Sequence, residues 1–158
     1  SFVPDYMDDK PESLIEGYVL QEDGSYKAAP YDMLMVGYAD GNIQSNVDDI
    51  LKWHKHLYME DTSVFLDRKL MKESFVNNPV ESTGILSGYG YGFFINGSIY
   101  HDGHVEGRRE IWHTGGTMGF ISRISRFIDD NVSIIMLTNY EGLPKDEMFF
   151  KIIKEVFA

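Results

Sequence analysis

The 158-residue chain contains no cysteine, no long hydrophobic run and no excess of positive charge. The absence of cysteine excludes a disulfide framework, a thiol nucleophile and a thiolate zinc site. No apolar run approaches the roughly 18 residues that a membrane-spanning helix needs. The net charge of −11 argues against a nucleic-acid partner, because a protein that binds phosphates needs a basic face.

Apolar and aromatic residues, in contrast, are plentiful. They make up 43% and 14% of the chain, which is enough for one packed core. The length suits a single domain, and we expect residues 1–158 to be one piece of a larger one, because the first residues are neither an initiator methionine nor a signal peptide. The composition leaves the cellular compartment open.

The spacing of apolar residues predicts an α+β fold, with helices preceding an antiparallel sheet that a C-terminal helix covers. Residues 1–44 are expected to be irregular apart from a hairpin around Asp23-Gly24, a dipeptide that favours tight turns. Residues 45–80 are expected to hold two helices, which begin at Ser45 and Asp67. Residues 88–158 are expected to form the sheet and the last helix, with strands over 89–95, 98–101, 109–114, 119–128 and 132–138 and a helix over 145–157.

The stretch His113-Thr114-Gly115-Gly116-Thr117 carries the clearest chemical signal. Glycines at the end of a strand let a ligand approach the backbone N–H groups, since no Cβ stands in the way. An imidazole and a hydroxyl beside them suit the binding of a carboxylate or of a developing oxyanion. The alternative is a glycine-rich hairpin whose polar side chains are only solvated.

The run from Ile111 to Tyr140 resembles the last strands of the serine β-lactamase and penicillin-binding-protein family. The likeness is strongest to class C β-lactamases, DD-carboxypeptidases, D-aminopeptidases and related esterases, whose third motif is Lys-Thr-Gly or His-Thr-Gly. Residues 41–57 and 89–93 resemble a helix and an aromatic strand of the same proteins. The resemblance implies part of a β-lactamase/transpeptidase-like fold, and it allows an extracytoplasmic location for the longer protein.

The resemblance also implies roles for individual residues. His113 and Thr114 would hold the carboxylate of a small-molecule or peptide substrate, and Gly115 would keep the strand edge open. Gly116 would donate its backbone N–H to the oxyanion hole. Glu141 lies near the position where some class C enzymes carry an asparagine, and an acid there would disfavour an anionic β-lactam relative to a peptide or an ester.

Two motifs of that family are missing from these 158 residues. No serine is followed by lysine at the third position, and neither Tyr-x-Asn nor Ser-x-Asn occurs. We therefore expect the C-terminal portion of a serine hydrolase that acts on D-alanyl peptides, β-lactams or esters and that is inactive without the missing nucleophile. The alternative is a non-catalytic binding or assembly module derived from the same fold.

Four other features bear on function. His101, Asp102, His104 and Glu106 suggest a metal site, but a solvated loop is the better interpretation, and we expect neither a metal nor a cofactor. His54 is expected to be an interior histidine, and Arg123 and Arg126 to be charges on the sheet surface. The strand over 132–138 would lack its N-terminal partner strand, which predicts a homodimer through this edge.

Overall fold

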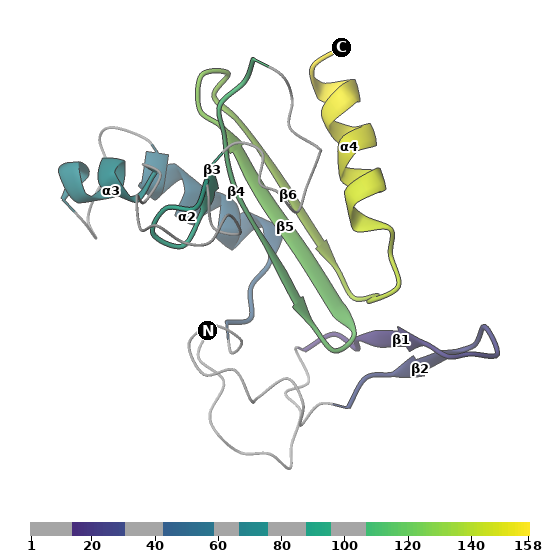
Figure 1. Cartoon of the computed structure of the whole chain (residues 1–158). Coiled ribbons are helices and arrows are strands. Elements are labelled where there is room, and N and C mark those ends of the chain that lie inside the picture. The colour runs from purple at the N-terminus through teal and green to yellow at the C-terminus, as the bar shows by residue number, and fades with distance from the viewer. Residues whose placement is uncertain (1–13, 31–42, 59–66, 76–87, 96–106) are drawn as a thin grey trace. The chain divides into compact units, whose positions relative to one another are not determined.

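The computed structural model describes residues 14–30, 43–58, 67–75, 88–95 and 107–158 (Figure 1). The chain divides into two compact units. The first contains Ser1–Val47, Thr114–Ser122 and Met136–Ala158, and the second contains Asp48–His113 and Arg123–Ile135. No helix in the described ranges is long and apolar enough to cross a membrane.

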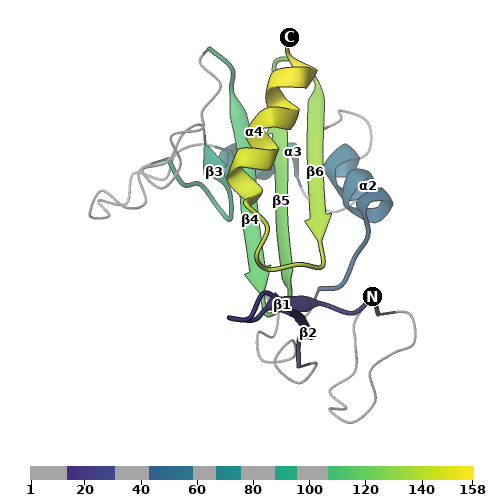
Figure 2. The same cartoon turned by 90° about the vertical axis from the view of Figure 1, so that its right-hand side faces the viewer.

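A four-stranded sheet has the order β3-β4-β5-β6 (Figure 2). Its strands are β3 (Phe94–Ile95), β4 (Glu110–Thr117), β5 (Phe120–Phe127) and β6 (Val132–Thr138). The three long strands lie where the alternating pattern predicts them, and short turns join them. Asn131 adopts a positive φ of 57° in the turn before β6, a conformation that asparagine tolerates better than most residues. In the described part of the chain, β6 is an edge strand.

The strand predicted over 89–95 is much shorter than expected, because only its last two residues form β3. Gly88 and Gly92 have φ values of 87° and 85°, which bend the chain away from an extended course. The Gly90 N–H donates to the Phe93 carbonyl at 2.8 Å, and the Ile95 N–H donates to the Gly88 carbonyl at 2.6 Å. The aromatic segment therefore folds back on itself. The partner strand predicted over 98–101 lies outside the described residues.

The first unit contains the hairpin predicted at Asp23-Gly24. Strands β1 (Tyr18–Leu20) and β2 (Tyr26–Ala28) pair antiparallel, with Tyr18 opposite Ala28. Gly24 has a φ of 82° at the turn, and the Asp23 carboxylate accepts the Ser25 N–H at 2.9 Å. The local turn chemistry therefore determines this hairpin.

Gly119, in the β4–β5 turn, lies close to the residues on both sides of the β1–β2 hairpin. Gly119 has a φ of 80°, and a Cβ at this position would lie 2.6 Å from the Ala29 Cβ and 2.8 Å from the Gly17 carbonyl carbon. Only glycine meets both the conformational and the steric requirement.

Three helices complete the described structure: α2 (Val47–Tyr58), α3 (Arg68–Ser74) and α4 (Lys145–Val156). The start of α2 is two residues later than predicted, and the Ser45 hydroxyl donates to the Asn46 carbonyl at 3.5 Å. The Asp67 carboxylate caps α3 as predicted, accepting the Lys69 N–H at 2.7 Å. Helix α4 buries Phe149 and Ile153, two residues of its predicted apolar stripe.

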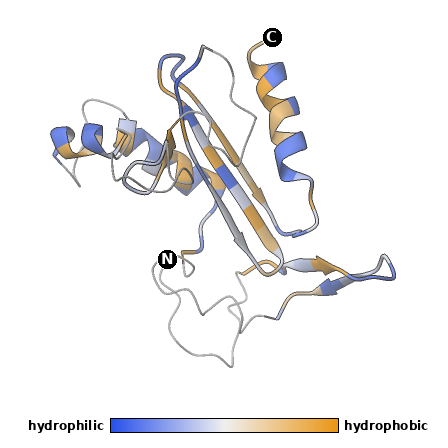
Figure 3. Ribbon diagram, viewed as in Figure 1, coloured by the Kyte–Doolittle hydropathy of each residue, from blue (hydrophilic) through white to orange (hydrophobic). Residues whose placement is uncertain are grey.

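A charged cluster lies in the core of the second unit. The Arg123 Nη2 donates to the Glu110 Oε1 at 3.3 Å, and the Ser125 Oγ donates to the same oxygen at 2.6 Å. The Arg123 guanidinium also lies 4.4 Å from the centre of the Trp112 ring. Because Arg123 is only 1% exposed, the expectation that it is a surface charge is wrong. The blue bands within β5 in Figure 3 mark its polar residues.

The error has a simple physical reason. Arg123 and Arg126 are three residues apart on one strand, so their side chains project from opposite faces of β5. Glu110, on the neighbouring strand, neutralises Arg123 inside the core, and sequence separation hides that pairing. Arg126 is half-buried and lines a cavity on its own face.

Candidate functional site

Strand β4 carries all four residues that the sequence singles out for substrate binding and the oxyanion hole. His113, Thr114 and Gly115 are half-buried, and Gly116 is exposed. The predicted strand over 109–114 continues to Thr117, so the two glycines belong to β4 rather than to the turn after it.

The His113 imidazole is held by an aromatic neighbour that the sequence motif does not include. Its Nε2 lies 2.9 Å from the Tyr89 hydroxyl oxygen, and its ring centre lies 5.5 Å from that of Phe94. Burial raises the pKa of Tyr89, which keeps the phenol protonated at neutral pH. This contact fixes the orientation of the imidazole ring. Whether Nε2 carries a proton depends on whether the imidazole or the Tyr89 hydroxyl donates the hydrogen bond.

The hydrogen-bond pattern of β3 determines where the amides of β4 point. The Ile95 N–H turns away from β4 to the Gly88 carbonyl, so the alternate residue, Phe94, directs its backbone groups toward β4. Phe94 lies opposite Trp112, whose N–H therefore points toward β3. The N–H groups of a strand point alternately to its two edges, so the N–H of Gly116, four residues after Trp112, projects from the same edge of β4 as that of Trp112.

That edge continues beyond the short strand β3. Within the described residues, β3 pairs with β4 only at Trp112 and Ile111. Gly116 lies four residues after Trp112, and a Cβ built on it meets no atom of the described residues within 4 Å. Gly116 is exposed, and an N–H at an exposed strand edge can donate to an incoming carbonyl oxygen.

Gly115 has a different constraint from Gly116. A Cβ on Gly115 would lie 2.6 Å from the Ser122 hydroxyl oxygen on β5, closer than ordinary side-chain contacts allow. Gly115 therefore permits close packing of β4 against β5, whereas Gly116 has no such steric constraint among the described residues.

Glu141, in the segment after β6, is fixed by the β4–β5 turn. One of its carboxylate oxygens accepts the Gly119 N–H at 3.1 Å. A position of Glu141 near a substrate carboxylate is implied only by the family resemblance. In the structure, the side chain of Glu141 has a backbone N–H as its hydrogen-bond partner.

The outcome for the remaining candidates is mixed. His54 is an interior residue as predicted: it is 3% exposed, and its Nδ1 lies 3.2 Å from the Ser133 Oγ. His101, Asp102, His104 and Glu106 lie outside the described residues. Among the residues that are described, no group of three or more His, Asp or Glu side chains could hold a metal ion.

The contact between Tyr89 and His113 is not predictable from the sequence motif. The two residues are 24 positions apart, and the aromatic pattern around Tyr89 indicates only a strand. The glycines near it at positions 88 and 92 were the available signal, since their positive φ values bend the segment that holds Tyr89.

Known proteins of one family are similar to this chain. The family model described as Beta-lactamase matches residues 6–152. Penicillin-binding protein 4* of Bacillus subtilis (strain 168) is 28% identical over 103 residues, which cover 65% of this chain and 20% of that protein.

Two solved structures share the fold. The octameric penicillin-binding protein homologue from Pyrococcus abyssi superposes with a TM-score of 0.74 at 21% identity, over 94% of this chain and 32% of that one. The penicillin binding protein from Bacillus halodurans gives a TM-score of 0.69 at 18% identity, over 96% of this chain and 42% of that one.

These likenesses confirm the predicted α+β fold with its antiparallel sheet as part of the penicillin-binding-protein fold. The chain spans less than half the length of each of the three relatives. Because the matching family model covers most of its residues, the chain belongs to the Beta-lactamase family.

Proposed function

We propose that this chain is the C-terminal portion of a serine hydrolase that works through an acyl-enzyme, with a D-alanyl peptide, a β-lactam or an ester as substrate. The observation that carries the proposal is the His113-Thr114-Gly115-Gly116 sequence on an open edge of β4 in a member of the Beta-lactamase family. The serine and its proton acceptor belong to sequence outside these 158 residues.

In the proposed reaction, the serine oxygen attacks the substrate carbonyl carbon, and the negative charge develops on the carbonyl oxygen. The Gly116 N–H and the N–H of the serine donate to that oxygen, so the transition state is stabilised more than the ground state. The leaving group departs as the acyl-enzyme forms, and water then releases the acid and restores the serine.

His113 and Thr114 have the complementary role of binding the substrate. The imidazole and the hydroxyl present donors to a carboxylate, and the Tyr89 hydroxyl holds the imidazole in a fixed orientation. Glu141 adds a negative charge next to the turn after β4, which favours an uncharged ester over a substrate that carries a carboxylate.

An oxyanion hole with one of its two donors gives little catalysis. Loss of one such donor typically raises the barrier by about 2.7–4 kcal/mol. The 158-residue chain, which also lacks the nucleophile, is therefore expected to form no covalent adduct with a fluorescent penicillin.

The test uses the protein translated from the complete reading frame. We expect this protein to be acylated by a fluorescent penicillin or to hydrolyse a D-alanyl peptide or a p-nitrophenyl ester. We expect His113→Ala to lower kcat/KM by about tenfold or more, because a carboxylate loses a hydrogen-bonding partner. Lys151→Gln, a change at an exposed position of α4, is the control and should leave kcat/KM unchanged. An unchanged kcat/KM in His113→Ala would contradict the proposal.

The second candidate is a non-catalytic binding or assembly module. The lack of Ser-x-x-Lys and Tyr-x-Asn in these residues favours it. A complete reading frame without either motif, together with no turnover of any of the three substrates, would support the module and exclude the hydrolase.

A further inference from the structure

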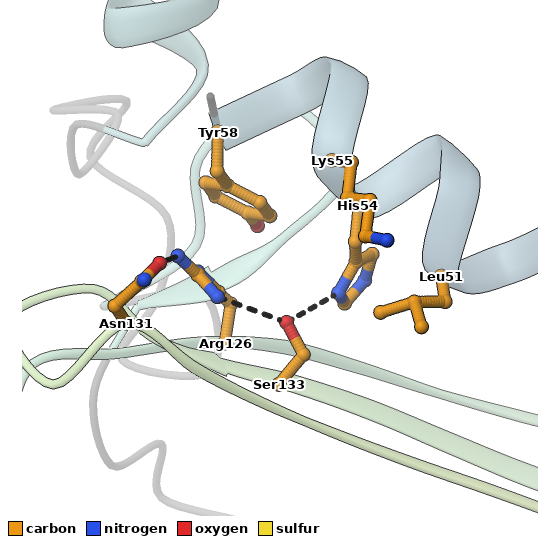
Figure 4. Close-up of a pocket in the computed structure, with 7 residues that line it drawn as sticks. All are labelled: Leu51, His54, Lys55, Tyr58, Arg126, Asn131 and Ser133. Atoms are coloured by element: carbon orange, nitrogen blue, oxygen red, sulfur yellow. Dashed lines mark hydrogen bonds between the residues drawn. The ribbon is translucent and has the colours of Figure 1, made fainter. Parts of the chain in front are cut away.

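The second unit contains a cavity of about 260 Å³ that is unrelated to the motif on β4. Helix α2 contributes Leu51, His54, Lys55 and Tyr58, which recur at the spacing of one helix face. The opposite wall consists of Arg126 on β5, Ser133 on β6 and Asn131 in the turn between them (Figure 4).

A hydrogen-bond chain orders the polar wall of this cavity. The Arg126 Nη1 donates to the Ser133 Oγ at 3.2 Å, and the Arg126 Nη2 donates to the Asn131 side-chain oxygen (Figure 4). Since Ser133 accepts from the guanidinium, its own proton is available to His54 Nδ1, 3.2 Å away. Burial, with a smaller contribution from Arg126, lowers the pKa of His54 to about 4, so the ring is neutral near neutral pH and its Nδ1 can accept this proton.

The described residues that line the cavity carry only positive charge. Arg126 and Lys55 are both cations, and none of the seven lining residues is an acid. The two acids of the β5–β6 turn pair with arginines that do not line the cavity: Asp129 pairs with Arg109, and Asp130 pairs with Arg108. Within the described residues, two cations therefore face a cavity whose lining has no carboxylate, although the chain has 25 acidic residues.

Arg126 itself lacks a counter-ion in the described part of the chain. Its guanidinium lies 5.3 Å from the centre of the Tyr58 ring, a contact that only partly offsets the loss of water. Its Nε is buried and has no hydrogen-bond partner among the described residues. Burial lowers the pKa of Arg126, the direction expected for a cation that the protein does not neutralise.

We propose that this cavity binds a small oxyanion, meaning the carboxylate or phosphate group of a small molecule. Arg126 supplies the planar fork that matches such groups, and Lys55 supplies a second charge from the rim. Ser133 and Asn131 hold the guanidinium in place, and Tyr58 and Leu51 form the apolar wall for the part of the ligand that carries the group. The site is separate from the β4 motif, so it does not depend on the proposed hydrolase activity.

The test is a titration of the 158-residue chain with inorganic phosphate and with acetate, at constant ionic strength and near neutral pH. Nitrogen-15 NMR follows the Arg126 Nε–H and the backbone amides of α2. We expect saturable shifts for at least one of the two anions. Tighter binding of phosphate would identify a phosphate ligand, and tighter binding of acetate would identify a carboxylate ligand. The absence of saturable shifts up to about 50 mM of either anion would overturn the proposal.

Two variants and a matched control localise the binding. Arg126→Lys keeps the charge but loses the fork, and we expect it to weaken binding by about tenfold. Lys55→Gln changes an exposed side chain that is not needed for folding, and we expect it to weaken binding by about fivefold. Lys52→Gln removes the same charge from the same helix outside the cavity and should change affinity by less than about twofold. Equal losses in Lys55→Gln and Lys52→Gln would indicate only general charge attraction and would overturn the proposal.

Discussion

Replacement of the His54 imidazole by the amide of His54→Gln should make the stability of the second unit less sensitive to acid. His54 is 3% exposed, and burial, with a smaller contribution from Arg126, lowers its pKa from 6.5 to about 4. The neutral imidazole is therefore strongly preferred in the folded state.

The sign and size of the effect follow from this difference in pKa. Above about pH 6.5 the imidazole is neutral in both states, and its burial has no pH-dependent cost. As the pH falls below 6.5, the unfolded chain binds a proton that the folded chain does not, so the free energy of unfolding decreases by up to about 1.4 kcal/mol per pH unit. The decrease ends near pH 4, where the folded state also binds the proton, and it totals about 3 kcal/mol.

Tryptophan fluorescence during urea denaturation is a suitable assay, because both tryptophans, Trp53 and Trp112, belong to the second unit. Between about pH 7 and about pH 5, wild type should lose about 2 kcal/mol more stability than His54→Gln. Carboxylates that titrate in this range are the same in both proteins and cancel in the comparison. Lys52→Gln, which leaves the imidazole in place, should follow wild type.

A direct NMR titration of the His54 ring gives an independent check. We expect its resonances to stay constant above about pH 5. A midpoint near 6.5, or equal acid sensitivity of wild type and His54→Gln, would refute the reasoning from burial.

Three further predictions concern stability and association. Glu110→Ala should reduce the free energy of unfolding by about 3–5 kcal/mol, because it leaves the Arg123 charge buried without its carboxylate; a loss below about 1 kcal/mol in urea denaturation would contradict this. Gly119→Ala should lower the free energy of unfolding by roughly 2–4 kcal/mol, because strain at a positive φ adds to a backbone clash. Gly24→Ala has a similar φ but no clash with described residues, and it should lower the free energy of unfolding by about 1 kcal/mol. Equal losses for the two variants in thermal unfolding would show that the clash is absent. The strand over 132–138 lies at an edge of the described sheet, and we predict a homodimer through it; a monomer by light scattering, with fast amide exchange along this strand, would count against the dimer.

Much of the fold could be predicted because its signals are local. The bounds of β6 match the prediction, and the Asp23-Gly24 turn and the Asp67 cap lie where the sequence places them. Each depends on residues only a few positions apart, which interact in the same way whatever surrounds them. The length of β3 could not be predicted in this way, because aromatic residues favour a strand while the glycines among them permit bends.

The candidate site was predicted in part. The His113–Gly116 motif identifies the strand and suggests its chemistry, but the roles of these residues rest on the family resemblance and remain predictions. The direction of the Gly116 N–H follows only from the pairing of Phe94 with Trp112. The support of His113 by Tyr89 follows only from the bend that the glycines allow.

By itself, the sequence determined that this chain is an acidic α+β protein without thiol chemistry, and it identified the strand with the His-Thr-Gly-Gly motif. Only the tertiary structure decided that Arg123 is buried against Glu110 and that His54, 79 positions from Ser133, borders a cationic cavity. The physical reason is that turns and periodicity depend on neighbouring residues. Burial, charge balance and pKa depend instead on groups that only folding brings together.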